Sequence, residues 1–157
     1  MTALHREFQV FVKPVGPACN LRCSYCYYLK KKELFDETGH CLMDQALLEE
    51  YILQLIEATT DDMVFFSWHG GEPTLAGLDF YKNAVNLQKK HLPPGKRHLN
   101  GIQTNGTLLD EEWCQFLARE NFLVGISIDG PEEFHNLNRI DHRGNGTFSE
   151  VLKGYGL

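Results

Sequence analysis

Segments typical of buried strands alternate with segments typical of helices along most of this chain. The sequence predicts strands at 8–13, 63–68, 98–104 and 122–128, and helices at 44–58, at 78–91 and from Asp110 onward. Such alternation produces a sheet of parallel strands joined by right-handed helical crossovers. The predicted fold class is therefore α/β, and the pattern alone is compatible with a barrel or with an open doubly wound sheet.

Residues typical of helix N-termini indicate where the predicted helices begin. Asp44 and Asp110 each precede an apolar helical pattern and are predicted N-caps. Thr147 and Glu150 have the spacing of a capping box, which predicts one more helix close to the end of the sequence at Leu157. Because that helix would have little chain left, we expect residues 1–157 to be the N-terminal portion of a longer protein.

Unusual turns follow all four predicted strands. They are a cysteine-rich loop after 8–13, His-Gly-Gly-Glu-Pro at 69–73, Gln-Thr-Asn-Gly at 103–106 and Ser-Ile-Asp-Gly at 127–130. In parallel α/β folds, ligands bind beyond the carboxyl ends of the strands. We therefore expect these four turns to form one site.

The cysteine loop holds Cys19, Cys23 and Cys26, spaced C-x3-C-x2-C. Clustered thiolates select zinc or an iron–sulfur cluster, and three thiolates on a four-iron cluster would leave one iron without a protein ligand. Two alternatives stay open at this point. One is a structural zinc site completed by His40 or Cys41, and the other is a redox pair formed by Cys23 and Cys26.

The other turns contain residues suited to a charged organic ligand. Gly70 and Gly71 permit backbone conformations that side chains forbid, and they allow close approach of a ligand. Glu72 can accept hydrogen bonds from an ammonium group, and Arg139 can bind a carboxylate through its planar fork. His69, just before the glycines, is compatible with either a ligand contact or a place in the core.

Composition narrows the classes of partner. The 157 residues include 43% hydrophobic residues, which suits a single domain with a core, and the formal net charge is -6 with a pI near 5.6. This charge argues against a nucleic-acid backbone or an anionic membrane as partner. The charged N-terminus and the lack of a long apolar run predict a cytoplasmic protein with reduced thiols. Cys41 receives no assignment.

The motif C-x3-C-x-aromatic-C resembles the signature of the radical S-adenosylmethionine (SAM) enzymes. The stretches 69–79, 103–109 and 124–139 further resemble the anaerobic sulfatase-maturating enzymes, a branch of that superfamily, and the likeness runs nearly from Phe8 to Phe148. The resemblance implies that the chain forms the front part of a partial (β/α)6 radical SAM barrel.

The same resemblance implies roles for individual residues. Cys19, Cys23 and Cys26 would bind a 4Fe–4S cluster whose fourth iron chelates SAM. The Gly70-Gly71-Glu72 turn would bind the SAM amino group, and further SAM contacts would come from Tyr25, Gly71, Ser127 and Arg139. Tyr28 and His69 would approach the peptide substrate, although His69 stands where relatives often have Gln.

The implied activity is oxidation of a Cys or Ser in a sulfatase polypeptide to Cα-formylglycine by a 5′-deoxyadenosyl radical. An electron donor such as flavodoxin or ferredoxin would reduce the cluster. Relatives carry the catalytic base and a C-terminal cluster-binding region in a later part that these residues do not include, so no catalytic residue is assigned here. The alternatives are another radical SAM peptide maturase, such as a thioether-forming enzyme, and a non-catalytic zinc-stabilised module.

Overall fold

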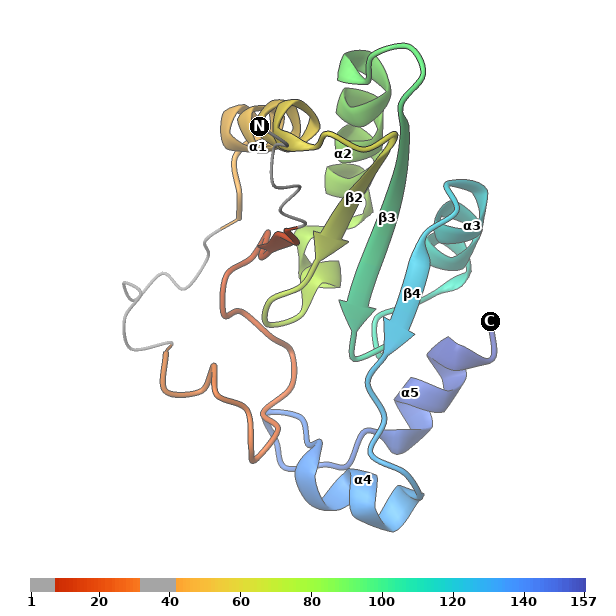
Figure 1. The fold of residues 1–157 in the computed structure, drawn as a ribbon. Helices are drawn as coiled ribbons and strands as arrows, with labels where there is room; N and C mark the ends of the chain where they lie inside the picture. The colour runs from red at the N-terminus through yellow and green to blue at the C-terminus, as the bar shows by residue number, and fades with distance from the viewer. Residues whose placement is uncertain (1–7, 32–41) are drawn as a thin grey trace.

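The computed structural model describes residues 8–31 and 42–157, and within them an α/β architecture (Figure 1). Its strands are β1 (Phe11–Val12), β2 (Met63–Trp68), β3 (Arg97–Thr104) and β4 (Leu123–Ile126). Its helices are α1 (Gln45–Ala58), the 3-10 helix η2 (Pro73–Ala76), α2 (Leu78–His91), α3 (Glu111–Arg119), α4 (Glu132–Asn138) and α5 (Phe148–Tyr155).

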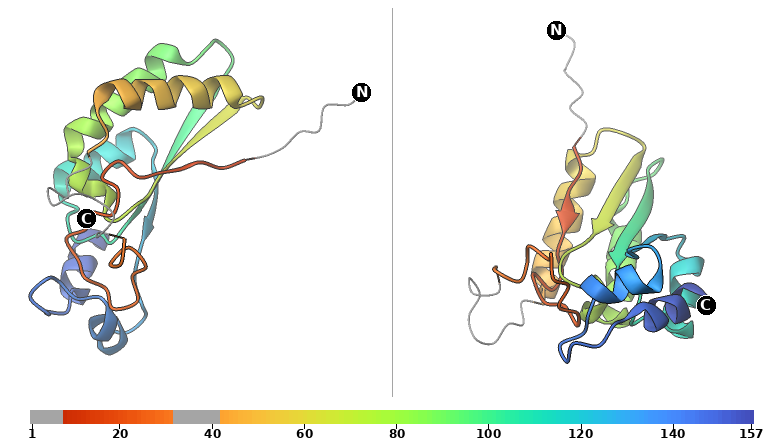
Figure 2. Two further views of the ribbon diagram at one scale, coloured as in Figure 1. Left: turned by 90° about the vertical axis from the view of Figure 1, so that its left-hand side faces the viewer. Right: turned by 90° about the horizontal axis from the view of Figure 1, so that it is seen from below.

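The four strands form one parallel sheet in the order β1-β2-β3-β4. Helices α1, α2 and α3 all lie on the same face of this curved sheet (Figure 2). A doubly wound sheet would reverse its strand order and carry helices on both faces. Sequential order with helices on one face is instead the winding of a barrel wall, so the structure resolves the choice that the pattern left open.

The core lies between the sheet and these helices. Alternate residues of β2, namely Val64, Phe66 and Trp68, are completely buried and point toward the helices, where α1 and α2 pack. The intervening Phe65 and Ser67 belong to the opposite face, where they border an open cavity. This period of two follows from the strand pleat, and it separates a packed face from a face available for binding.

A polar group buried within this core is fully paired. Asn100 of β3 accepts hydrogen bonds from Trp68 Nε1 at 2.8 Å and from Gln88 Nε2 at 2.9 Å. Its own amide donates to Gln88 Oε1 at 2.8 Å. The cost of burying three polar side chains is therefore offset by hydrogen bonds that fix α2 against β2 and β3.

The predicted elements agree with the structure where the sequence pattern is strong. The predicted strand 63–68 and helix 78–91 have the observed bounds, and the Asp44 and Asp110 side chains accept from Leu47 and Trp113 as N-caps. The first and fourth strands are shorter than predicted, since only Phe11 and Val12 pair with β2 and only 123–126 pair with β3.

The predicted helix near the end of the sequence exists as α5, but the capping box does not form. Thr147 makes no side-chain cap to α5. Its hydroxyl donates to the carbonyl of Arg139 at 2.9 Å and lies 3.2 Å from His135 Nε2. The capping prediction is therefore wrong, because tertiary partners take the hydroxyl. The short helix α4 was not predicted, and its N-cap, Pro131, has no side-chain hydrogen bond.

No helix in the described ranges combines the length and the apolar character that crossing a membrane requires.

Strand β4 generates a prediction about residues 1–157 expressed alone. Its outer edge has no strand partner among residues 8–31 and 42–157, and Leu123 on it is 57% exposed. Unpaired apolar edges associate, so we expect concentration-dependent oligomers in size-exclusion chromatography with light scattering. Leu123→Lys should shift them toward monomer, whereas Leu152→Lys on α5 should not. A monomer at every concentration would contradict this expectation.

Candidate functional site

A cavity of about 220 Å³ lies at the carboxyl ends of the strands, where the four predicted turns meet. Every site residue predicted from the sequence lines it: Cys19, Cys23, Tyr25, Cys26, Tyr28, His69, Gly70, Gly71, Glu72, Ser127 and Arg139. These residues come from segments more than 100 positions apart, and the parallel winding brings them to one rim.

The three cysteines are free thiols, with Cys23 buried and Cys19 and Cys26 half-buried. Burial raises the pKa of Cys19 to about 11, and the negative charge of Glu72 contributes to the same shift. The thiol therefore holds its proton at neutral pH unless a metal cation compensates the charge. In the described ranges no three His, Cys, Asp or Glu side chains form a single-ion site. The thiols instead border a shared cavity, which suits a cluster of several atoms.

The glycine turn holds the cysteine loop in place through its backbone. Gly71 N donates to Gly16 O at 2.9 Å, and Glu72 N donates to Ala18 O at 2.7 Å. A Cβ on Gly71 would collide with the carbonyl of Ala18, so the close approach depends on glycine. Gly70 has a φ of +128°, which confirms the unusual backbone predicted there.

The Glu72 carboxylate is completely buried and engaged by protein donors. Its Oε1 accepts from Thr74 N at 3.1 Å and from the hydroxyls of Thr74 and Thr104, both at 2.6 Å. Its Oε2 accepts from Asn105 N at 2.7 Å. The sequence suggested this carboxylate as the acceptor for a ligand ammonium. In the structure its oxygens join two turns while Glu72 lines the cavity, so its role as acceptor for a ligand ammonium stays a prediction.

Asn105 and Asn20 extend the hydrogen-bond network of Glu72, and neither was predicted as an individual site residue. The Asn105 side chain donates to Asn20 Oδ1 at 2.9 Å, and Asn20 in turn donates to Thr107 Oγ1 at 2.8 Å. Asn105 Nδ2 also lies 3.9 Å from the sulfur of Cys19. In the sequence, the Thr-Asn-Gly turn after β3 indicated that this segment lies at the carboxyl ends of the strands, like the rest of the site.

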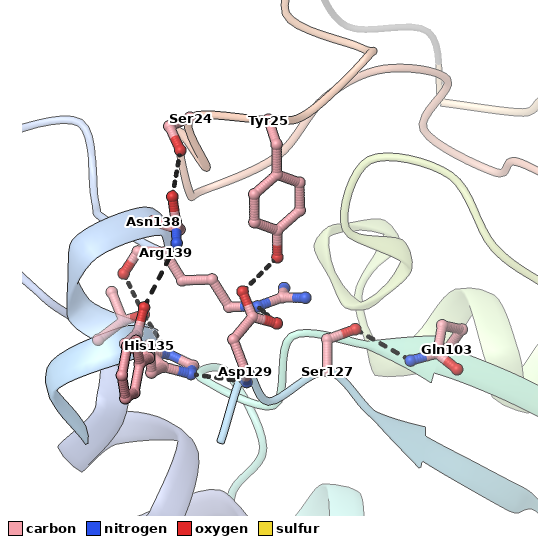
Figure 3. A network of polar contacts seen from close by, with 10 residues as sticks. Ser24, Tyr25, Gln103, Ser127, Asp129, His135, Asn138 and Arg139 are labelled. Atoms are coloured by element: carbon pink, nitrogen blue, oxygen red, sulfur yellow. Dashed lines mark hydrogen bonds and ion pairs between the residues drawn. The ribbon is translucent and has the colours of Figure 1, made fainter. Parts of the chain in front are cut away.

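A second network connects the cysteine loop to the segment after β4 (Figure 3). The Tyr25 hydroxyl donates to Asp129 Oδ2 at 2.5 Å, and Arg139 Nε donates to Asp129 Oδ1 at 2.9 Å. The backbone follows the same path, since Arg22 N donates to Ile140 O and Ser24 N donates to Asn138 O. The loop is thus fixed on both sides of the cavity.

Ser127 is held by a neighbouring strand. Its backbone N–H donates to Thr104 O at 2.9 Å, and its hydroxyl accepts from Gln103 Nε2 at 3.0 Å. Gly125 makes room for this contact, because a Cβ there would meet the Gln103 amide. Among residues 8–31 and 42–157 the Ser127 hydroxyl donates to no acceptor, so its proton can be donated to a ligand in the cavity.

His69 and Tyr28 both line the thiol cavity. His69 lines both this cavity and the cavity of about 430 Å³ on the open sheet face, so it is not a core residue. Its Nε2 lies 3.1 Å from Ser67 Oγ, and its ring meets that of Phe11 edge-on. Burial, with the nearby charge of Lys13, lowers the pKa of His69, so its ring is neutral at pH 7.

The fold is part of a parallel α/β barrel wall, and three thiols and several polar side chains line one cavity at its strand ends. The family model of the Radical SAM superfamily matches residues 14–156, and the chain belongs to this superfamily.

The sequence is 49% identical over 152 residues to the serine-type anaerobic sulfatase-maturating enzyme of Bacteroides thetaiotaomicron, covering 97% of this chain and 36% of that protein. It is 42% identical over 142 residues to the cysteine-type enzyme of Clostridium perfringens, covering 90% of this chain and 38% of that one. The chain thus spans a little over a third of the length of these curated relatives.

Solved structures agree with the sequence comparison. The structure of native anSMEcpe with bound AdoMet and Cp18Cys peptide superposes with a TM-score of 0.83 at 40% identity, covering 94% of this chain and 38% of that one. The four parallel strands alternating with helices therefore match part of a radical SAM enzyme, as the sequence predicted.

The buried Glu72 carboxylate generates a stability prediction. In Glu72→Gln either amide orientation places an NH2 group against a backbone N–H, that of Thr74 or that of Asn105. Loss of such charge-assisted bonds costs about 1.5–3 kcal/mol, so we expect a lower melting temperature in differential scanning fluorimetry. The matched control is Glu50→Gln, since exposed Glu50 accepts only from Gln54 on the same helix within the described residues. Equal melting temperatures for the two variants would show that Glu72 does not hold the turns.

Proposed function

We propose that the protein containing residues 1–157 is a radical SAM oxidoreductase that converts a Cys or Ser of a sulfatase polypeptide to Cα-formylglycine. One observation carries the proposal: three thiols, the glycine turn and Arg139 line a single cavity. Similarity to both serine-type and cysteine-type sulfatase-maturating enzymes supports the choice of reaction. Residues 1–157 would form the N-terminal portion of the radical SAM domain.

In this proposal Cys19, Cys23 and Cys26 hold a 4Fe–4S cluster. When bound, the cluster and SAM would supply the radical chemistry that takes one hydrogen atom from the β-carbon of the target residue, and a second electron must then leave the substrate for the aldehyde to form. The chain's own task is to bind and orient. The thiols fit such a cluster, because three buried or half-buried thiols provide the soft ligands that iron requires and leave one iron without a protein ligand for SAM.

The polar residues around the cavity suit the charged end of SAM. Arg139 reaches Asp129 through Nε, and its two terminal nitrogens have no hydrogen-bond partner among the described residues. They can bind the SAM carboxylate in the bidentate manner of a guanidinium. The backbone of Gly70 and Gly71 would accept hydrogen bonds from the amino group of SAM, and the Ser127 hydroxyl would donate a hydrogen bond to SAM.

The peptide would enter from the open sheet face. His69 lines both the cavity of the open sheet face and the thiol cavity, and Tyr28 lines the thiol cavity, so both would contact a peptide bound over the cofactor. The neutral imidazole can donate or accept there, and Lys13 lies 5.0 Å above the Tyr28 ring. The catalytic base and further clusters would come from other parts of the protein. A cytoplasmic reductant such as flavodoxin or ferredoxin would supply electrons.

The test uses the complete gene product that contains residues 1–157, reconstituted anaerobically with iron and sulfide. It is incubated with SAM, dithionite and two peptides that differ only in carrying Cys or Ser at the target position. We expect mass spectrometry to find the aldehyde product from at least one peptide, together with 5′-deoxyadenosine. Cys23→Ala should abolish both products, whereas Cys114→Ala, on α3, should not.

The product pattern separates the alternatives. Formation of 5′-deoxyadenosine without aldehyde would reject formylglycine formation and favour another radical SAM peptide maturase. Zinc in place of iron, with neither product, would reject radical chemistry and favour a zinc-stabilised module.

A further inference from the structure

Asp129 was not predicted as a site residue, yet it joins two of the residues proposed to contact SAM. It lies after β4 in the Ser-Ile-Asp-Gly turn, and each of its carboxylate oxygens has one partner (Figure 3). Oδ2 accepts from the Tyr25 hydroxyl, and Oδ1 accepts from Arg139 Nε. The two partners come from the cysteine loop and from the end of α4, which are otherwise separate in the sequence.

The contact is partly shielded from water, which strengthens it. The side chains of Asp129 and Arg139 are only 26% and 15% exposed. Burial alone would raise the pKa of Asp129, but the Tyr25 hydroxyl and the Arg139 guanidinium outweigh it, so the pKa is lowered and the carboxylate is charged at neutral pH. The guanidinium carbon also lies 5.6 Å from the centre of the Tyr25 ring, so arginine and tyrosine are packed together.

The backbone around this ion pair is fixed by His135, which is completely buried. Asp129 N donates to His135 Nδ1 at 3.4 Å, and Arg139 N donates to His135 O at 2.7 Å. On its other side, His135 Nε2 lies 3.2 Å from the Thr147 hydroxyl, which donates to Arg139 O. Both ends of the ion pair are thus anchored on one side chain and its backbone.

The orientation of Arg139 follows from these contacts. Asp129 takes only the Nε edge of the guanidinium, so the terminal nitrogens remain for an anion in the cavity. A long arginine side chain without such a contact would sample several rotamers and lose that freedom on binding a ligand.

We propose that Asp129 is a positioning residue for SAM binding, which holds Arg139 and Tyr25 in the orientation that receives the cofactor without contacting it directly. This inference rests on the proposed function and extends it to a residue outside the predicted site. Because Tyr25 lies between Cys23 and Cys26, Asp129 also connects the arginine to the loop that carries the cluster ligands.

The test is a double-mutant cycle on the complete gene product, loaded with iron and titrated anaerobically with SAM by isothermal calorimetry. We expect Asp129→Asn to raise the SAM dissociation constant about tenfold when Arg139 is present, the scale of losing one charge-assisted contact. In the Arg139→Ala background the same substitution should change it by less than about twofold, since Asp129 acts through Arg139. A purely structural role would weaken binding equally in both backgrounds.

The control is Asp79→Asn, which breaks an exposed ion pair with Lys82 on α2 and should leave SAM affinity unchanged. If Asp129→Asn lowers the iron content, SAM affinity is compared for the iron-loaded fraction of each variant in both Arg139 backgrounds. Equal effects in the two Arg139 backgrounds, or no effect in either, would overturn the inference while leaving the proposed function intact. A failure of the unsubstituted protein to bind SAM would overturn both.

Discussion

The buried carboxylate of Glu72 is the contact on which the arrangement of this site depends. It accepts hydrogen bonds from Thr74 in its own turn and from Thr104 and Asn105 after the next strand. Backbone bonds from the same turn then reach the cysteine loop, where Ala18 accepts from Glu72 N. The carboxylate and the backbone N–H of Glu72 together therefore connect the turns after β1, β2 and β3. Burial of the carboxylate is tolerable because its donors replace water.

The opposite side of the cavity is organised by the same physical means. There the charge of Asp129 is compensated by Arg139 and by the Tyr25 hydroxyl, and backbone bonds again join the cysteine loop to a distant segment. Residues 14–31, the described part of the cysteine loop, contain no helix or strand, so their shape depends on these two anchors. Rigid placement of the three thiols is what the proposed cluster, with one iron lacking a protein ligand, would need.

Much of the fold was predictable because β2 and α2 carry strong periodic patterns. The position of the site at the carboxyl ends of the strands was predictable because its motifs are turns that follow strands. The burial of Glu72 could not be predicted from the sequence, because its partners Thr104 and Asn105 lie more than 30 residues away. Asp129 was missed for a similar reason, since Tyr25 is 104 residues distant. The capping prediction at Thr147 failed because local patterns do not reveal tertiary competitors for a hydroxyl. Local sequence thus specifies elements, while long-range hydrogen bonds specify the site.

The most direct test of the account is electron paramagnetic resonance of the reduced, iron-loaded gene product with and without SAM. If Cys19, Cys23 and Cys26 hold a cluster with one iron open to the cavity, adding SAM should change the spectrum of the reduced cluster. In Arg139→Ala the same change should require a higher SAM concentration. A spectrum that SAM leaves unchanged, or a protein that takes up zinc and no iron, would contradict the account.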